Sequence, residues 1–165
     1  MSNLKVKTIV DEDFINFKQP SMYIATCLCD FKCCREQGLD VSICQNSEIV
    51  KQPTIEISNE AIYKRFISND ISKAVVIGGL EPLKQFDEVL SLIKYFRDRD
   101  CHCPFVIYTG YEPNEIERQV KQIAITGRND IYFKFGRFIP NQQPHYDDIL
   151  GVKLISDNQR GVRMC

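Results

Sequence analysis

The chain has 165 residues, of which 44% are hydrophobic and 26% are charged, a balance typical of one packed domain. Its net charge of −1 excludes a general nucleic-acid or anionic-membrane binder, because such proteins need surplus basic residues. No apolar run approaches the roughly 20 residues that span a bilayer, and the amino terminus lacks the apolar core of a signal peptide. We therefore expect a single domain over residues 1–165 in the cytoplasm, without nucleic-acid or membrane partners.

The predicted elements alternate between strands and helices along most of the chain. Alternating or β-branched runs predict strands at residues 5–10, 21–26, 74–77, 105–108, 131–133 and 152–155. Apolar residues at helical spacing predict helices at residues 58–70, 82–99 and 116–123. Strands that alternate with helices indicate an α/β fold with an open parallel sheet of about five or six strands and flanking helices.

Three polar segments directly follow predicted strands. They are the cysteine-rich loop that starts at Cys27, the turn at residues 78–81 and the segment at residues 109–111. In a parallel sheet, ligands bind beyond the carboxyl ends of the strands. We therefore expect these three segments to meet at one edge of the sheet and to form the site there.

Eight cysteines are the unusual feature of the composition, and five of them lie within residues 27–44. Cys29 and Cys33 are separated by three residues, and Cys44 follows after ten more. Three thiolates can hold three irons of a cubane cluster and leave the fourth iron without a protein ligand. An open metal position is useful because a substrate or cofactor can bind there.

Other interpretations of the cysteines remain open from the sequence. A structural zinc site would recruit Cys27 or Cys34 as the fourth ligand, and plain buried cysteines are a further alternative. Cys101, His102 and Cys103 precede a predicted strand and form either a second metal half-site or an ordinary helix-to-strand turn. Cys165 is a terminal thiol without an interpretable context.

Two motifs carry a family resemblance. The segment Cys29-Asp30-Phe31-Lys32-Cys33 resembles the first half of the radical S-adenosylmethionine motif, whose three cysteines hold a [4Fe-4S] cluster. Residues 43–46 resemble the end of that motif, displaced by an insertion of eight residues, and residues 77–82 are similar to the glycine-glycine-glutamate-proline segment with Leu80 added. From about Pro20 to Arg160, including residues 107–111, 136–139 and 156–160, the chain is most similar to anaerobic ribonucleotide reductase activating proteins. Lys134 and Phe135 stand where that family commonly has an acidic residue.

The resemblance implies a fold, a reaction and a set of site residues. The fold would be an incomplete radical-S-adenosylmethionine-type barrel, since a full barrel needs about 250 residues. Cys29, Cys33 and Cys44, in a cluster loop at residues 27–46, would hold the [4Fe-4S] cluster. The resemblance assigns S-adenosylmethionine binding to Gly78, Gly79, Glu81, Ile43, Asn46 and Thr109.

The implied reaction is reductive cleavage of S-adenosylmethionine to methionine and a 5′-deoxyadenosyl radical. That radical would form the glycyl radical of the anaerobic ribonucleoside-triphosphate reductase, with reduced flavodoxin or a ferredoxin-type protein as electron donor. Two alternatives remain: radical chemistry on a different small molecule or peptide, and a non-enzymatic zinc or iron–sulfur binding module.

Overall fold

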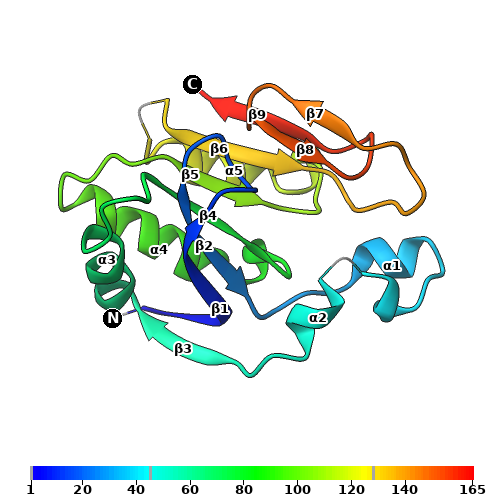
Figure 1. The fold of residues 1–165 in the computed structure, drawn as a ribbon, viewed down its shortest axis with the longest axis horizontal. Coiled ribbons are helices and arrows are strands. Elements are labelled where there is room, and N and C mark those ends of the chain that lie inside the picture. The colour runs from blue at the N-terminus through cyan, green and yellow to red at the C-terminus, as the bar shows by residue number, and fades with distance from the viewer. Residues whose placement is uncertain (1, 45, 128) are drawn as a thin grey trace.

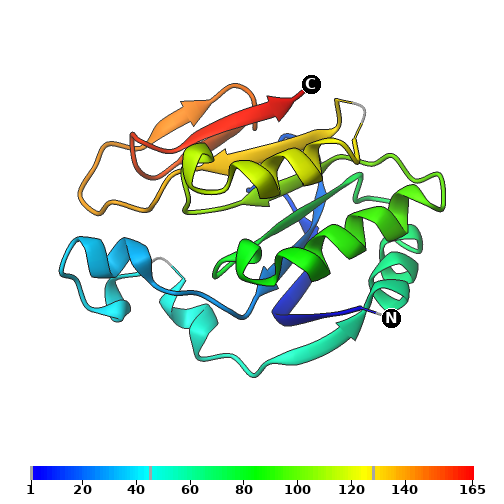
Figure 2. The ribbon, with the colours of Figure 1, turned by 180° about the vertical axis from the view of Figure 1, so that it is seen from behind.

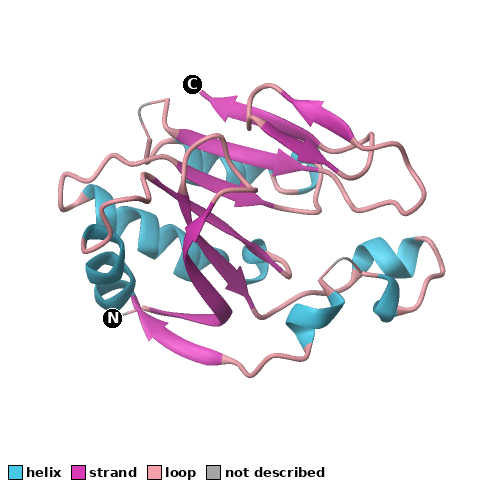
Figure 3. Cartoon of the chain, in the orientation of Figure 1, coloured by secondary structure: helices cyan, strands magenta, loops and turns pink. Residues whose placement is uncertain are grey.

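A seven-stranded sheet organises the protein, in a computed structural model that describes residues 2–44, 46–127 and 129–165. The strand order is β3-β1-β2-β4-β5-β6-β9 (Figures 1 and 3). Four central strands, β2, β4, β5 and β6, run parallel, whereas β1, β3 and β9 are antiparallel to their neighbours. The bounds are β1 Asn3–Asp13, β2 Ser21–Thr26, β3 Ile55–Ser58, β4 Ala74–Gly79, β5 Phe105–Tyr108, β6 Ile131–Phe135 and β9 Arg160–Met164.

Three helices cover one face of the sheet: α3 (Asn59–Ile67), α4 (Phe86–Arg97) and α5 (Glu117–Ala124) (Figure 2). The main hydrophobic core lies between these helices and the sheet, and Phe96 of α4 is fully buried there. The remaining helical segments are short: α1 (Lys32–Glu36), α2 (Ser47–Val50) and the 3₁₀ turns η1 (Val41–Ile43), η2 (Pro82–Gln85) and η3 (Pro113–Glu115). No helix in the part of the chain that the structure describes is long and apolar enough to cross a bilayer.

The opposite face of the sheet has a smaller core. It is covered by the hairpin of β7 (His145–Asp147) and β8 (Val152–Leu154) and by Phe17 from the β1–β2 connection. Phe17 packs edge-on against Tyr132 of β6, with ring centroids 5.0 Å apart. Both faces of the central strands are therefore buried, which explains their continuous β-branched sequences.

The expectation of a parallel sheet with five or six strands was wrong in two respects, because the sheet has seven strands and is mixed. The connection from β1 to β2 is short, and parallel neighbours need a long crossover. For this reason β1 pairs with β2 in an antiparallel arrangement. Residues 152–155 also differ from the prediction, because β8 pairs with β7 in a separate two-stranded sheet. Within the described residues β3 and β9 form the two edges, so the sheet is open and does not close into a barrel.

The helix predicted at residues 82–99 is divided. Pro82 and its neighbours form the 3₁₀ turn η2, and the α-helix begins at Phe86. Gln85 leaves the helical conformation because its side chain holds the backbone of β1: its amide oxygen accepts from the Lys5 N–H at 2.9 Å, and its amide nitrogen donates to the Lys5 carbonyl at 2.8 Å. This pair of hydrogen bonds fixes the turn after β4 against the sheet.

Candidate functional site

A cavity of about 160 Å³ lies at the carboxyl ends of the parallel strands. The segments that follow β2, β4, β5 and β6 all contribute to its wall, so the predicted convergence of three segments at this edge is confirmed, and β6 adds a fourth. Its lining residues are Asn16, Tyr23, Cys29, Asp30, Lys32, Cys33, Cys44, Asn46, Gly79, Leu80, Glu81, Tyr108, Thr109, Gly110, Tyr111, Lys134, Gly136, Arg137 and Phe138.

Three thiols form one side of this cavity: those of Cys29, Cys33 and Cys44. The backbone N–H of Phe31 donates to Sγ of Cys29 at 3.2 Å, and the N–H of Asn46 donates to Sγ of Cys44 at 3.4 Å. A hydrogen bond from the Cys44 thiol lowers the pKa of Cys33 to about 6, whereas burial raises the pKa of Cys29 to about 11. Of these three cysteines, Cys33 therefore has the lowered thiol pKa.

Cys34 is the competitor for the third ligand position. Its thiol is buried and hydrogen-bonded to that of Cys33, but it is not among the described residues that line the cavity. Sγ of Cys27 lies 3.9 Å from the amide nitrogen of Gln85, and Cys27 is likewise not among the described residues that line the cavity. The assignment of Cys29, Cys33 and Cys44 as ligands stays a prediction, and Gln45, within the same motif, lies outside the described residues.

The donor set of the cavity fits an iron–sulfur cubane. All eight cysteines are free, and thiolates are the usual ligands of such clusters. The N–H···S hydrogen bonds to Cys29 and Cys44 are of the kind that stabilises ligated sulfur. Within the described residues, no three His, Cys, Asp or Glu side chains are arranged around one metal ion. The three thiolates of a cubane bind three different irons, so a cluster does not require them to meet at one point.

Cys101 and Cys103 lie on the turn between α4 and β5, at the edge of the sheet opposite the cavity. Arg97 fixes this turn, because its Nη1 donates to the carbonyls of Cys101 and Cys103 at 2.8 and 3.0 Å. The two thiols hydrogen-bond each other, which lowers the pKa of Cys101 to about 6. The segment therefore lies on a helix-to-strand turn, and a metal role for its two thiols stays a prediction.

The turn after β4 forms another side of the cavity. Gly79 has a φ of +83°, and a Cβ there would lie 2.6 Å from Cα of Ala25, so only glycine fits between β4 and β2. The side-chain amide of Asn46 donates to the carbonyl of Gly79 and joins the cysteine loop to this turn. Gly78 and Ile43, both predicted to bind the cofactor, do not line the cavity, and Ile43 is 46% exposed.

Glu81 is buried and fully engaged with the protein. Its Oε1 accepts from the Leu83 N–H at 3.1 Å and from Oγ1 of Thr109 at 2.9 Å, and its Oε2 accepts from the Gly110 N–H at 2.9 Å. Burial raises the pKa of this carboxyl, although these hydrogen bonds oppose the shift. Glu81 and Thr109 therefore hold the ends of β4 and β5 together at the cavity.

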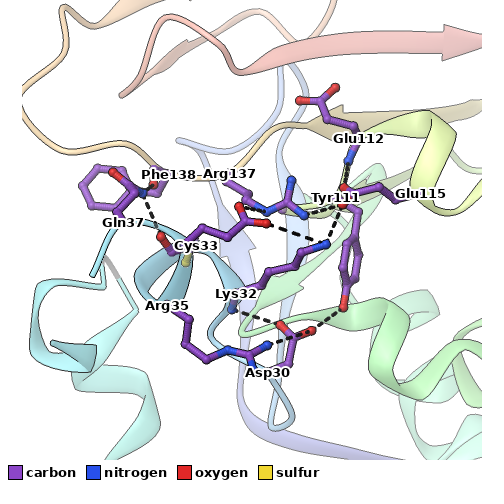
Figure 4. Close-up of polar contacts among 12 residues, drawn as sticks. Asp30, Lys32, Cys33, Arg35, Gln37, Tyr111, Glu112, Glu115, Arg137 and Phe138 are labelled. Atoms are coloured by element: carbon purple, nitrogen blue, oxygen red, sulfur yellow. Dashed lines mark hydrogen bonds and ion pairs between the residues drawn. The ribbon is translucent and has the colours of Figure 1, made fainter. Parts of the chain in front are cut away.

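An ion-pair network closes the rim of the cavity near the cysteine loop (Figure 4). Glu115 accepts from Nζ of Lys32 and from Nη2 of Arg137, both at 2.6 Å. Asp30 accepts from the hydroxyl of Tyr111 at 2.8 Å. Side chains from the cysteine loop, the segment after β5 and the loop after β6 thus meet in one network.

Sequence reasoning missed several residues of the cavity wall, notably Tyr23, Tyr108 and Lys134. The two tyrosines lie within buried strands, where the sequence pattern indicates core packing. In the sequence Lys134 stands out only as a departure from the family pattern, yet it is 5% exposed and lines the cavity. The available signal in the sequence was a single charged residue flanked by apolar ones in the segment Ile131–Phe135, all of which the structure buries.

Residues 19–160 match the family model described as a 4Fe-4S single cluster domain. The match includes the whole cysteine loop and all four segments that line the cavity. No curated protein sequence matches the chain.

Proposed function

Because the chain belongs to the 4Fe-4S single cluster domain family, we propose that it is a radical S-adenosylmethionine enzyme whose cluster is held by Cys29, Cys33 and Cys44. The observation that carries the proposal is the cavity at the strand ends. The wall of this cavity combines three thiols with backbone carbonyl and hydroxyl groups from the ends of β4 and β5. When bound, the cluster supplies the electron that cleaves S-adenosylmethionine into methionine and a 5′-deoxyadenosyl radical.

The protein's own part in this reaction is to bind and orient the cofactor. The carbonyl of Gly79 accepts one hydrogen bond from Asn46 and has a second lone pair for the ammonium group of the methionine part. Glu81 does not need to contact the cofactor, because its oxygens already bind Leu83, Thr109 and Gly110. Its role in this proposal is to hold the turn after β4 in place.

Two further segments, which follow β6 and precede β9, suggest the substrate. Residues 136–139 and 156–160, which resemble activating proteins of the anaerobic ribonucleotide reductase, pack against each other at the rim of the cavity. The amide of Asn158 donates to the carbonyl of Arg137 at 2.8 Å, and a Cβ at Gly136 would lie 2.9 Å from the carbonyl oxygen of Asn158. We propose the anaerobic ribonucleoside-triphosphate reductase as partner, with reduced flavodoxin or a ferredoxin-type protein as electron donor.

The test is anaerobic reconstitution with iron and sulfide, followed by addition of S-adenosylmethionine and dithionite. Formation of 5′-deoxyadenosine and methionine in equal amounts would support the proposal, and their absence from cluster-loaded protein would refute it. In a second arm the reductase is added, and a glycyl radical is sought by electron paramagnetic resonance. Cofactor cleavage without a glycyl radical would indicate a different substrate for the same radical chemistry.

A further inference from the structure

Cys101 and Cys103 form a pair of half-buried thiols on the turn between α4 and β5. The two side chains hydrogen-bond each other, and the backbone N–H of Cys103 also donates to the sulfur of Cys101. The turn leads into the amino end of β5, whereas the cavity lies at the carboxyl ends of the parallel strands. Neither cysteine is among the described residues that line the cavity, so the pair forms a separate candidate site.

A buried guanidinium group fixes the pair in this arrangement. Nη1 of Arg97 donates to the carbonyls of both cysteines, and its Nε donates to the carbonyl of Thr126 at 3.0 Å. Nη2 of Arg97 pairs with Asp130 at 3.1 Å, and only 9% of the arginine side chain is exposed. Because the turn is held on several sides, the two thiols stay next to each other, which favours a reaction between them.

The two thiols differ in acidity. The hydrogen bond from the Cys103 thiol lowers the pKa of Cys101 to about 6, and the positive charge of Arg97 acts in the same direction. The same thiol–thiol hydrogen bond raises the pKa of Cys103. Cys101 is therefore largely a thiolate at pH 7, and the thiolate is the form that attacks a disulfide. A low-pKa thiol next to a second thiol is typical of redox-active cysteine pairs.

The surroundings of the pair favour disulfide chemistry over a metal site. Structural zinc takes four ligands, and within the described ranges no group of three His, Cys, Asp or Glu side chains could hold a metal ion. His102 lies between the two cysteines in sequence, but its Nε2 is 2.9 Å from a carboxylate oxygen of Asp100. A disulfide needs only the two thiols, and both of them are present.

We propose that Cys101 and Cys103 are a redox-active pair that low-molecular-weight disulfides oxidise, independently of the cluster. The Cys101 thiolate attacks one sulfur of the disulfide, so that a mixed disulfide forms and one thiol leaves. Cys103 then loses its proton and attacks the Cys101 sulfur, which closes the bond between the two cysteines and releases the second thiol. The pair loses two electrons and two protons, and the disulfide gains them and becomes two thiols. The bond encloses one intervening residue, so it adds little stability and is readily reduced again.

The test treats cluster-loaded protein anaerobically with glutathione disulfide, blocks the remaining thiols with iodoacetamide and maps tryptic peptides by mass spectrometry. Trypsin cleaves after Arg99 and Arg118, so the peptide of residues 100–118 contains both thiols and no other cysteine. An internal disulfide leaves this peptide without alkylation and two hydrogen atoms lighter, whereas a mixed disulfide adds glutathione. This measurement does not depend on cleavage of S-adenosylmethionine, so its failure is distinguishable from failure of the proposed function.

The expected product in the wild type is the internal disulfide. A neighbouring thiol acts at an effective concentration of about millimolar or more, so the internal disulfide should exceed the glutathione adduct by about tenfold or more. Cys103→Ala should stop at the adduct on Cys101. Cys101→Ala should form its adduct about tenfold more slowly, because Cys103 is mostly a protonated thiol. Cys165→Ser removes the exposed terminal thiol, and this matched control should behave like the wild type.

Three outcomes would overturn the inference, provided that circular dichroism and iron content show each variant to be folded and loaded. The first is a wild-type peptide that keeps both thiols free or carries glutathione without an internal disulfide. The second is zinc that binds to the wild type and is lost from both Cys101→Ala and Cys103→Ala, which would establish the metal alternative. The third is an equal rate of adduct formation in these two variants, which would remove Cys101 as the attacking thiol.

Discussion

Glu115 and Arg137 form an ion pair in which Oε1 and Nη2 lie 2.6 Å apart, and the same oxygen lies 2.6 Å from Nζ of Lys32 (Figure 4). One carboxylate thus joins η3 after β5, the loop after β6 and α1 of the cysteine loop. The hydrogen bond from Arg137 is the main reason that the pKa of Glu115 falls to about 2. This contact holds α1, which carries Cys33, against the rest of the cavity.

Replacement of Glu115 by Gln should lower the free energy of unfolding at pH 7 by about 1 kcal/mol, because a partly exposed ion pair contributes little more. A carboxyl whose pKa is depressed on folding stabilises the protein above its unfolded pKa of about 4.3. That contribution is lost as the pH falls toward the folded pKa of about 2. The difference between wild type and variant should therefore shrink between pH 4.5 and pH 2.

Urea unfolding at several pH values measures this difference. Glu117→Gln is the matched control, since Glu117 pairs with Lys121 on the exposed face of α5. It should change the unfolding free energy by only about 0.5 kcal/mol or less. A Glu115→Gln difference that stayed constant down to pH 3 would show that the carboxylate charge is not what stabilises the rim.

The cysteine assignment predicts a specific pattern of cluster loss. Cys29→Ala, Cys33→Ala and Cys44→Ala should each prevent stable assembly of the cubane, because each removes a thiol from the cavity wall. Cys101→Ala and Cys103→Ala should leave the cluster intact, because both residues lie at the opposite edge of the sheet. Iron and sulfide content after anaerobic reconstitution measures the outcome.

Cys34→Ala is the decisive control for the third ligand. Its thiol touches Cys33 but is not among the described cavity-lining residues, so cluster content should remain near that of the wild type. Retention of the cluster in Cys44→Ala, together with its loss in Cys34→Ala, would reassign the third ligand. Bound zinc without sulfide in protein reconstituted with both metals would favour the structural zinc alternative.

Two glycines of the cavity should respond differently to alanine. At Gly79 a Cβ would lie 2.6 Å from Cα of Ala25 and 2.8 Å from the backbone nitrogen of Thr26, so Gly79→Ala should destabilise the fold. At Gly110 the nearest atom would be Oε2 of Glu81 at 3.7 Å, which is ordinary contact, so Gly110→Ala should fold. Its methyl group would narrow the cavity, and binding of S-adenosylmethionine should weaken.

Thermal unfolding and calorimetric binding separate these two effects. A melting temperature for Gly110→Ala within a few degrees of the wild type, with weaker binding, is the expected combination. Full affinity in this variant would place the ligand away from Gly110. A wild-type melting temperature for Gly79→Ala would contradict the close packing between β4 and β2.

Gln85 provides a test of the fold that is independent of the cluster. Gln85→Ala removes both hydrogen bonds to the Lys5 backbone, and because these groups are partly buried the loss should cost about 1 kcal/mol. Denaturant unfolding measures this loss, with Gln122→Ala on α5 as a matched control. Equal stability of the Gln85 and Gln122 variants would show that the clamp between β1 and η2 contributes nothing to stability.

The sequence alone determined the central elements of this protein. Residues 74–77 and 105–108 are continuous apolar runs because both of their faces are buried, and they form strands as predicted. The cysteine loop directly follows a strand, which predicts a site at the carboxyl edge of the sheet, and a cavity lies there. Periodicity identifies such elements because it depends only on neighbours along the chain.

Only the tertiary structure decided how these elements combine. Pairing of β9 with β6 joins residues distant in sequence, and the β7–β8 hairpin stays outside the main sheet. Local periodicity carries no information about strand partners. Packing between separate strands and loops decides which thiols line the cavity and excludes Cys34 from its wall. The same packing buries the Lys134 amine. These features depend on contacts between distant segments, because burial and proximity are properties of the folded chain and not of any single segment.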